Sequence, residues 1–331
     1  GAQTARAVAN FPISGQAMPS DFIAATLVIK SAAAKANAQL GLLDDARATA
    51  IVTAIDNLMT TDWSPHFPVD VFQTGSGTST NMNANEVIAR LASDAADAPV
   101  HPNDHVNMGQ SSNDVIPSAL HISALMAART MLRPAMNKLQ AALATKAVEF
   151  DAVVKIGRTH LMDAVPIRLG QEFSGYARQV ELGIARLDTA CDGLRELAIG
   201  GTAVGTGLNT HLEFGAEVCE LITGRTGEVF RVAGNRFEAQ AARDAAVQFS
   251  GTLRTIAISL SKIASDIRLM GSGPRCGLGE LTLPATQPGS SIMPGKVNPV
   301  MCESVVQVAC QVVGCDAAIA AGAMGGVGSI L

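Results

Sequence analysis

Apolar residues recur at alternating steps of three and four along most of this chain, which is the period of an amphipathic helix. The clearest series runs through Phe249, Leu253 and Ile256 to Met270. It predicts one helix, which would be roughly 50 Å long at the usual helical rise if residues 236–270 are unbroken. Such a length is typical of a helix in a bundle.

Further helices are expected wherever the same period returns, at residues 20–42, 45–60, 83–92, 113–150, 173–198 and 305–319. Within residues 113–150, Pro117 is compatible with a first turn, whereas Pro134 is expected to kink the helix. Only residues 152–156 and 229–233 favour strands, and both are equally compatible with loops. The fold class expected is therefore all-α.

We expect two domains in the 331 residues. Residues 1–110 are predicted to form a smaller N-terminal helical domain that carries binding loops. Residues 111–331 are predicted to form a central bundle of long helices, in which Ala and other small residues allow close helix packing.

Four stretches replace the helical pattern with Gly, Ser, Thr, Asn and His, namely residues 74–85, 101–114, 157–166 and 287–303. Polar loops between apolar helices are where binding and catalysis concentrate. These loops therefore hold the candidate site residues.

The most informative loop is residues 289–298, where two Gly and a Pro shape a turn. It ends in Asn298, an expected N-cap, followed by Pro299 at the first helical position. Lys296 then stands at a helix start, where backbone N–H groups and the positive end of the dipole attract a carboxylate or phosphate. A nucleotide-binding P-loop is excluded because Val297 stands where Ser or Thr is needed.

Two more loops precede helices with hydroxyl and amide side chains, Gly75-Ser76-Gly77-Thr78 and Ser111-Ser112-Asn113-Asp114. Three anion sites in one chain suggest a small substrate with more than one carboxylate. Taken alone, each of these two loops is more often an ordinary helix cap than a binding site.

His160 lies in a loop beside Thr159 and Arg158. A lone His is more often structural, but an imidazole in a polar loop suits the activation of water. Glu303, expected one turn into the last helix, is a candidate to orient His160, although an acidic residue in a first turn is also a routine dipole partner.

Composition excludes several classes of function. The net charge is −5, and the 24 Lys and Arg are scattered, which argues against nucleic acid. The six Cys lack metal-ligand spacing, so we expect no metal and a reducing compartment, the cytoplasm or, in a eukaryote, the mitochondrion. No membrane span and no dinucleotide cofactor are expected. Charged residues are only 16%, which favours an oligomer.

At residues 289–298 the sequence resembles the fumarase/aspartase superfamily, whose signature G-S-S-x-M-P-x-K-x-N it matches. Gly295, the Arg-Thr-His ending at His160, and the His-Pro-Asn-Asp beginning at His101 make it most similar to class II fumarases. Family members begin earlier and continue into a small C-terminal domain, so the resemblance implies that these parts are missing from this sequence.

The resemblance implies a cofactor-free enzyme of the tricarboxylic acid cycle that hydrates fumarate to (S)-malate. It implies a homotetramer whose active sites are shared between subunits. Ser290 would be the base, His160 with Glu303 would handle the water, and Lys296 and Asn298 would hold the reacting carboxylate. The other substrate-binding residues implied are Ser76, Gly77, Thr78, Ser111, Ser112, Asn113, Thr159 and Ser291.

A second dicarboxylate site would include His101, Asn103 and Asp104, but the Arg usual in the family is Ala98 here. Two alternatives to a hydratase stay open. One is an ammonia lyase of the same superfamily, similar to aspartase, and the other is a catalytically inactive helical scaffold.

Overall fold

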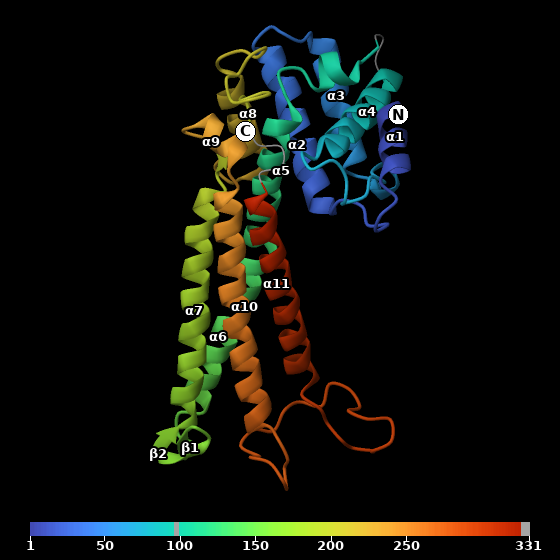
Figure 1. Ribbon diagram of the computed structural model, residues 1–331. Coiled ribbons are helices and arrows are strands. Elements are labelled where there is room, and N and C mark those ends of the chain that lie inside the picture. The colour runs from blue at the N-terminus through green and yellow to red at the C-terminus, as the bar shows by residue number, and fades with distance from the viewer. Residues whose placement is uncertain (96–98, 326–331) are drawn as a thin grey trace. The chain divides into compact units, whose positions relative to one another are not determined.

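The computed structural model describes residues 1–95 and 99–325 and consists mainly of helices (Figure 1). The chain divides into two compact units. Of the described residues, the first unit comprises those within Gly1–Ala128 and Cys191–Ala246 together with 323–325, and the second comprises Arg129–Ala190 and Val247–Gly322. The boundary expected after residue 110 lies inside the first unit, because the chain leaves this unit after Ala128 and returns to it at Cys191.

The first unit is helical apart from one pair of very short parallel strands. Its elements are α1 (Ala2–Asn10), α2 (Ser20–Gln39), α3 (Asp45–Leu58), η1 (Ser64–His66), α4 (Thr78–Ala95), η2 (Pro102–Val106), α5 (Ser112–Ala127), β3 (Glu196–Leu197), α8 (Phe214–Thr226), β4 (Arg231–Val232) and α9 (Arg236–Ala241).

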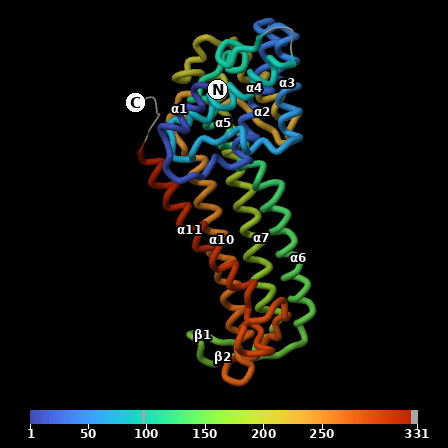
Figure 2. Tube along the Cα trace, turned by 90° about the vertical axis from the view of Figure 1, so that its right-hand side faces the viewer, coloured from blue at the N-terminus to red at the C-terminus, as the bar shows by residue number. Residues whose placement is uncertain are grey.

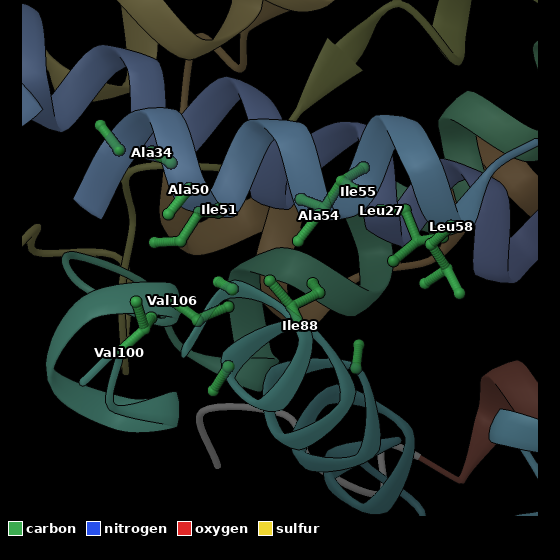
Figure 3. Close-up of a cluster of buried hydrophobic side chains, with 14 of the residues drawn as sticks. Leu27, Ala34, Ala50, Ile51, Ala54, Ile55, Leu58, Ile88, Val100 and Val106 are labelled. Atoms are coloured by element: carbon green, nitrogen blue, oxygen red, sulfur yellow. The ribbon is translucent and has the colours of Figure 1, made fainter. Parts of the chain in front are cut away.

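Its main core forms where α2, α3 and α4 pack together, as Figure 3 shows. Leu27, Ile51, Ile55 and Ile88 have no solvent exposure. They recur on one face of each helix because apolar residues three and four apart lie on the same side. This rigid core carries the loops that enter α4 and α5.

The second unit contains long helices and one antiparallel hairpin. Its elements are η3 (Ala128–Leu132), α6 (Arg133–Glu149), β1 (Val154–Thr159), β2 (Met162–Arg168), α7 (Leu169–Gly193), α10 (Asp244–Met270) and α11 (Val300–Met324). The helices α6, α7, α10 and α11 run along one another, and the β1–β2 hairpin lies at one end of this bundle (Figures 1 and 2).

The all-α prediction is confirmed, with corrections to particular elements. The single helix expected over 236–270 is wrong, because α9 ends at Ala241 and α10 begins at Asp244. Ala242 is extended, and the guanidinium of Arg243 donates to the carbonyls of Ala242 (2.6 Å) and Gln240 (3.0 Å). The arginine side chain thus satisfies carbonyls at the end of α9, and the hydrophobic period alone cannot reveal this break.

Other helix and strand boundaries differ from the predicted ones by fewer residues. The helix expected over 83–92 begins at Thr78, and the one expected over 173–198 ends at Gly193. The strand expected over 152–156 is longer and pairs with β2, which the periodicity did not indicate. At Pro134 the expected irregularity is present, since η3 separates α5 from α6.

Two helical stretches, Ser112–Glu149 and Val300–Met324, are long and apolar enough to cross a membrane by length and composition. Core helices of soluble proteins meet the same criteria, so this observation is weak evidence for a membrane span. The expectation that the chain has no membrane span stays a prediction.

Truncation of a core side chain tests the first unit. Ile55→Ala is expected to lower the free energy of unfolding by about 2–5 kcal/mol, because it removes buried methylenes and leaves a cavity. Urea unfolding followed by circular dichroism measures this. In Ile13→Ala the same atoms are lost from a side chain that is 64% exposed, and the change should stay below about 0.5 kcal/mol. Equal losses would contradict the assignment of the core.

Candidate functional site

The loop before α4 presents two hydroxyl groups at a helix N-terminus. Ser76 Oγ and Thr78 Oγ1 are 2.7 Å apart and half-buried. Gly77 between them has φ +70, and a Cβ there would come within 3.0 Å of Ile116 on α5. Glycine therefore lets this loop press against α5, which brings two of the predicted anion-binding loops together.

The start of α5 is held by a capping box. Ser111 Oγ accepts from the N–H of Asn113 (3.2 Å), and Asp114 Oδ1 accepts from the N–H of Ser111 (2.9 Å). The ordinary capping interpretation of this loop is therefore correct for Ser111. Asn113 donates its amide to the carbonyl of Ala203 (2.8 Å).

A buried network ties these two helix starts to each other. Asn81, in the first turn of α4, donates to Asn107 Oδ1 (3.2 Å) and to Ser112 Oγ (3.5 Å). The ammonium of Lys30 on α2 donates to the same Asn107 oxygen (2.7 Å) and to Gln110 Oε1 (2.9 Å). The Lys30 ammonium thus orders the segment before α5 directly, and it is linked to the start of α4 through Asn107 and Asn81.

Lys30 and Asp114 have no solvent exposure, and their charges attract each other. Burial disfavours both charged forms, so it lowers the pKa of Lys30 and raises the pKa of Asp114. The carboxylate also accepts from the N–H groups of Gly200 (3.2 Å) and Thr202 (2.9 Å). These hydrogen bonds join the residue 200–202 segment to the start of α5.

In the second unit, His160 lies at the tip of the β1–β2 hairpin. Thr159 pairs with Met162, so His160 and Leu161 are the two turn residues, and their φ values are 55° and 63°. Positive φ at both central positions is the mark of a type I′ turn, which usually contains Asn and Gly. A His and a Leu there store backbone strain, which recurs at functional sites.

The loop bearing Ser290 is closed at its neck. The N–H of Gly289 donates to the carbonyl of Lys296 (2.9 Å), and Asn298 Nδ2 donates to the carbonyl of Gly289 (2.7 Å). Ser290 Oγ accepts from the N–H of Ile292 (3.3 Å). Ser291 and Lys296 are exposed on the loop.

The N-cap expected at Asn298 is wrong. Its amide closes the loop neck, and the first backbone bond of α11 runs from the N–H of Glu303 to the carbonyl of Pro299 (3.1 Å). The helix therefore begins at Val300, and Glu303 stands in its first turn as predicted. Lys296 lies in the loop, before the helix start.

The predicted second site lies on η2 and the residue before it. His101 caps η2 by accepting from the N–H of Asp104 (3.1 Å), while Asn103 and Asp104 are exposed. Ala98, which bears on this prediction, lies outside the described residues. Among residues 1–95 and 99–325, no group of three or more His, Cys, Asp or Glu side chains is arranged to hold a metal ion.

The predicted site residues form two groups. Ser76, Gly77, Thr78, Ser111, Ser112 and Asn113 belong to the first unit, whereas Thr159, His160, Ser290, Ser291, Lys296, Asn298 and Glu303 belong to the second. In the described parts of this chain, no hydrogen bond joins Glu303 to His160. The roles of both residues therefore stay predictions.

Sequence reasoning missed Lys30, Asn81, Asn107 and Gln110, all of which order the loops. A lysine inside the apolar pattern of residues 22–36 was a usable signal, because a buried cation needs nearby acceptors. Asp114 stands three residues after Ser111, which is the spacing of a capping box.

Comparison with known proteins decides the family. A profile of the lyase family matches residues 1–314. A Corynebacterium efficiens protein described as class II fumarate hydratase is 58% identical over 326 residues, which cover 98% of this chain and 69% of that protein. The chain belongs to the class II fumarase family.

Other members of the family agree. A class II fumarate hydratase of Halobacterium salinarum is 60% identical over 98% of this chain and 70% of its own length. The crystal structure of recombinant class II fumarase from Schistosoma mansoni gives a TM-score of 0.94 at 42% identity, covering 98% of this chain and 72% of that chain. The resemblance inferred from the signature loop is therefore confirmed.

The capping box supplies a stability test. Asp114→Asn is expected to lower the free energy of unfolding by about 1–3 kcal/mol, because an amide offers one acceptor oxygen to three backbone N–H groups. Urea unfolding measures the change.

The control for this variant is Asp104→Asn, since Asp104 is 75% exposed and its side chain pairs only with His101 in the described chain. A change below about 1 kcal/mol is expected there. If the control loses as much stability as Asp114→Asn, the buried carboxylate is not what holds the loop.

Proposed function

We propose that this chain is a fumarate hydratase that adds water reversibly across the double bond of fumarate to give (S)-malate. The observation that carries the proposal is the 58% identity to class II fumarate hydratases over 98% of the chain, with the signature loop intact. The substrate is a small dicarboxylate, in keeping with several anion-binding loops in one chain.

Ser290 is the proposed base, which removes a proton from the carbon beside a carboxylate of malate. A serine hydroxyl ionises too weakly for this task unless its environment stabilises the alkoxide. The N–H of Ile292, which donates to Ser290 Oγ at 3.3 Å, supports this role. The ammonium of Lys296 on the same loop adds a positive charge that favours the ionised form.

Proton removal leaves two negative charges on the reacting carboxylate, which prepositioned donors must stabilise. Lys296 and Asn298 are proposed to do so, and the closed neck of the loop supports a fixed geometry for both. His160, with Glu303, would protonate the departing hydroxyl in dehydration and activate water in hydration.

The second carboxylate is proposed to bind at the starts of α4 and α5. There Ser76, Thr78 and Asn113 offer polar side chains beside backbone N–H groups, and the positive ends of the two helix dipoles favour an anion. Ser112 and Thr159 complete the proposed substrate contacts.

A homotetramer with shared sites is proposed for the active form. Helix α11 carries many apolar side chains, yet in the described chain only Ala309 and Asp316 of this helix are buried. Val308 is 60% exposed and Met301 is 62% exposed. Apolar area of this extent is typical of a surface that another chain covers.

Removal of the proposed base tests the chemistry. Ser290→Ala is expected to lower kcat for malate dehydration by about 10²- to 10⁴-fold, the usual contribution of a general base. Fumarate formation is followed by its ultraviolet absorbance.

The matched control for this test is Ser174→Ala, which removes an exposed hydroxyl that bonds only within α7 and should leave kcat within twofold. A rate for Ser290→Ala equal to that of the control would refute the role of Ser290. Ammonium-dependent loss of fumarate in the wild type would instead favour the ammonia lyase.

Shared sites predict complementation. If Ser290 and His160 of one site come from different subunits, two variants of low activity, Ser290→Ala and His160→Asn, should regain activity when they are unfolded together and refolded as mixed tetramers. Each variant refolded by itself is the control. No gain above the separately refolded variants would show that both residues of a site come from one chain.

A further inference from the structure

A cluster of ion pairs connects the hairpin that carries His160 to the segment after α10, and its residues have no role in the proposed chemistry. Lys155 and Arg158 on β1 both bind the carboxylate of Glu280, which follows α10 in the chain. The Lys155 and Arg158 side chains are 9% and 16% exposed, and that of Glu280 is 19% exposed. All of these residues belong to the second unit.

A bulge in β1 makes the cluster possible. Residues three apart on a regular strand point to opposite faces, so Lys155 and Arg158 should diverge. The register of β1 against β2 shifts between Ile156 and Arg158, which reverses the alternation. Gly157 lies at the shift, and a Cβ there would come within 2.7 Å of the carbonyl of Val165. The missing side chain thus lets both cations reach one carboxylate.

Glu280 and Arg158 form a two-point contact. Arg158 Nη1 donates to Oε1 (2.8 Å) and Nη2 donates to Oε2 (2.6 Å). Paired, charge-assisted bonds of this kind fix orientation as well as distance. In agreement, the bonds from Arg158 lower the pKa of Glu280, and the bonds to Glu280 raise the pKa of Arg158.

The backbone of Glu280 is itself anchored, because its N–H donates to the carbonyl of Met270 at the end of α10 (2.8 Å). Lys155 has a second carboxylate partner in Glu172 on α7 (2.8 Å). Within the described chain, the side chain of Arg158 has no hydrogen-bond or ion-pair partner other than Glu280. Loss of Glu280 would therefore release Arg158 far more than Lys155.

Arg158 directly precedes Thr159 and His160, where the turn holds two residues at positive φ. Such strain persists only when the surroundings hold the backbone in place. Gly157 and Arg158 supply this restraint on one side of the turn, and the pairing of Thr159 with Met162 supplies it on the other.

We propose that Glu280 is a positioning residue for the hydration of fumarate. By binding Arg158, Glu280 holds the strained turn, and hence the His160 imidazole, in the orientation needed for proton transfer to and from water. This inference rests on the proposed function. It adds a residue that touches no reacting atom to the set that determines the rate.

Glu280→Gln tests the proposal, because an amide keeps the shape of the side chain but loses the charge and one acceptor oxygen. We expect kcat to fall about 10- to 100-fold, since a displacement of about 1 Å in a catalytic group costs about 10²-fold. KM for fumarate should change less than kcat, because Thr159 is the one residue of the hairpin that is proposed to contact substrate, whereas the carboxylates are held mainly by residues that do not contact Arg158.

The matched control is Asp151→Asn, which makes the same change at the opposite end of the same hairpin. Asp151 accepts from Arg168 Nε at 3.0 Å, and its side chain is 59% exposed. This variant should keep kcat within twofold. A loss equal to that of Glu280→Gln would mean that any weakened ion pair on the hairpin lowers the rate, and would overturn the proposal.

A test in the His160→Asn variant separates a positioning role of Glu280 from general damage to the structure. In His160→Asn, the change Glu280→Gln should lower the residual kcat by less than twofold, because the group that it orients is already gone. A further loss of 10-fold or more in this background would overturn the proposal. Glu280→Asp, which keeps the carboxylate, should lose less activity than Glu280→Gln, and it takes the place of that variant in both backgrounds if Glu280→Gln does not fold.

The wild type distinguishes the two levels of inference. If the assembled wild type does not hydrate fumarate, the proposed function fails. If the wild type is active and Glu280→Gln matches it in kcat, only the role of Glu280 fails.

Discussion

The hydrogen bonds of the buried Asp114 carboxylate hold in place the part of the proposed site that lies in the first unit. The carboxylate accepts hydrogen bonds from the backbone N–H groups of Ser111, Gly200 and Thr202, and Ser111 is far from the other two in the sequence. A helix start leaves several N–H groups unsatisfied, and this carboxylate satisfies one of them while binding a second loop. The nearby Lys30 compensates its charge and orders Asn107 and Gln110. Burial of both charges is costly, which is consistent with a network retained for the geometry that it fixes.

The second unit also holds its candidate catalytic residues in position with polar contacts, but its charged groups lie nearer the surface. Apart from Glu303 on α11, its candidate catalytic residues lie on a tight turn and a long loop, neither of which has a hydrophobic core of its own. The turn is restrained by the ion cluster around Glu280, and the loop by hydrogen bonds across its neck between Gly289, Lys296 and Asn298. In both units polar contacts outside the proposed chemistry hold the groups that would perform it. These contacts fix the orientation of the proposed site residues in addition to their contribution to stability.

The sequence was sufficient to predict the helical fold and the family, for different reasons. Long apolar series fill whole helices, so the period that predicted α10 and α11 was read over many turns. The signature at residues 289–298 is specific because many residue types, among them Ser290, Lys296 and Asn298, stand at fixed spacings within ten residues. Short elements escaped prediction, because β2 exposes nearly all its residues and therefore shows no alternation of buried and exposed positions.

The contacts that support the site were not predictable from local patterns. Lys30 and Asn107 are 77 residues apart, and Arg158 and Glu280 are 122 apart. A hydrophobic period reports which face of one helix is buried, and it contains no information on which distant polar groups meet. The break at Ala242 escaped for a related reason, since it depends on where the side chain of Arg243 folds back.

The exposed apolar length of α11 has a consequence for the newly made chain. Exposed apolar side chains such as Met301 and Val308 bind other apolar surfaces with little selectivity, so burial of α11 against another chain would compete with aggregation from the moment of synthesis. Aggregation should gain on assembly as the concentration of incompletely folded chains rises. If the proposed homotetramer covers α11, the yield of folded protein in the cell would depend on how quickly the chains associate, and chaperones that shield α11 would raise that yield.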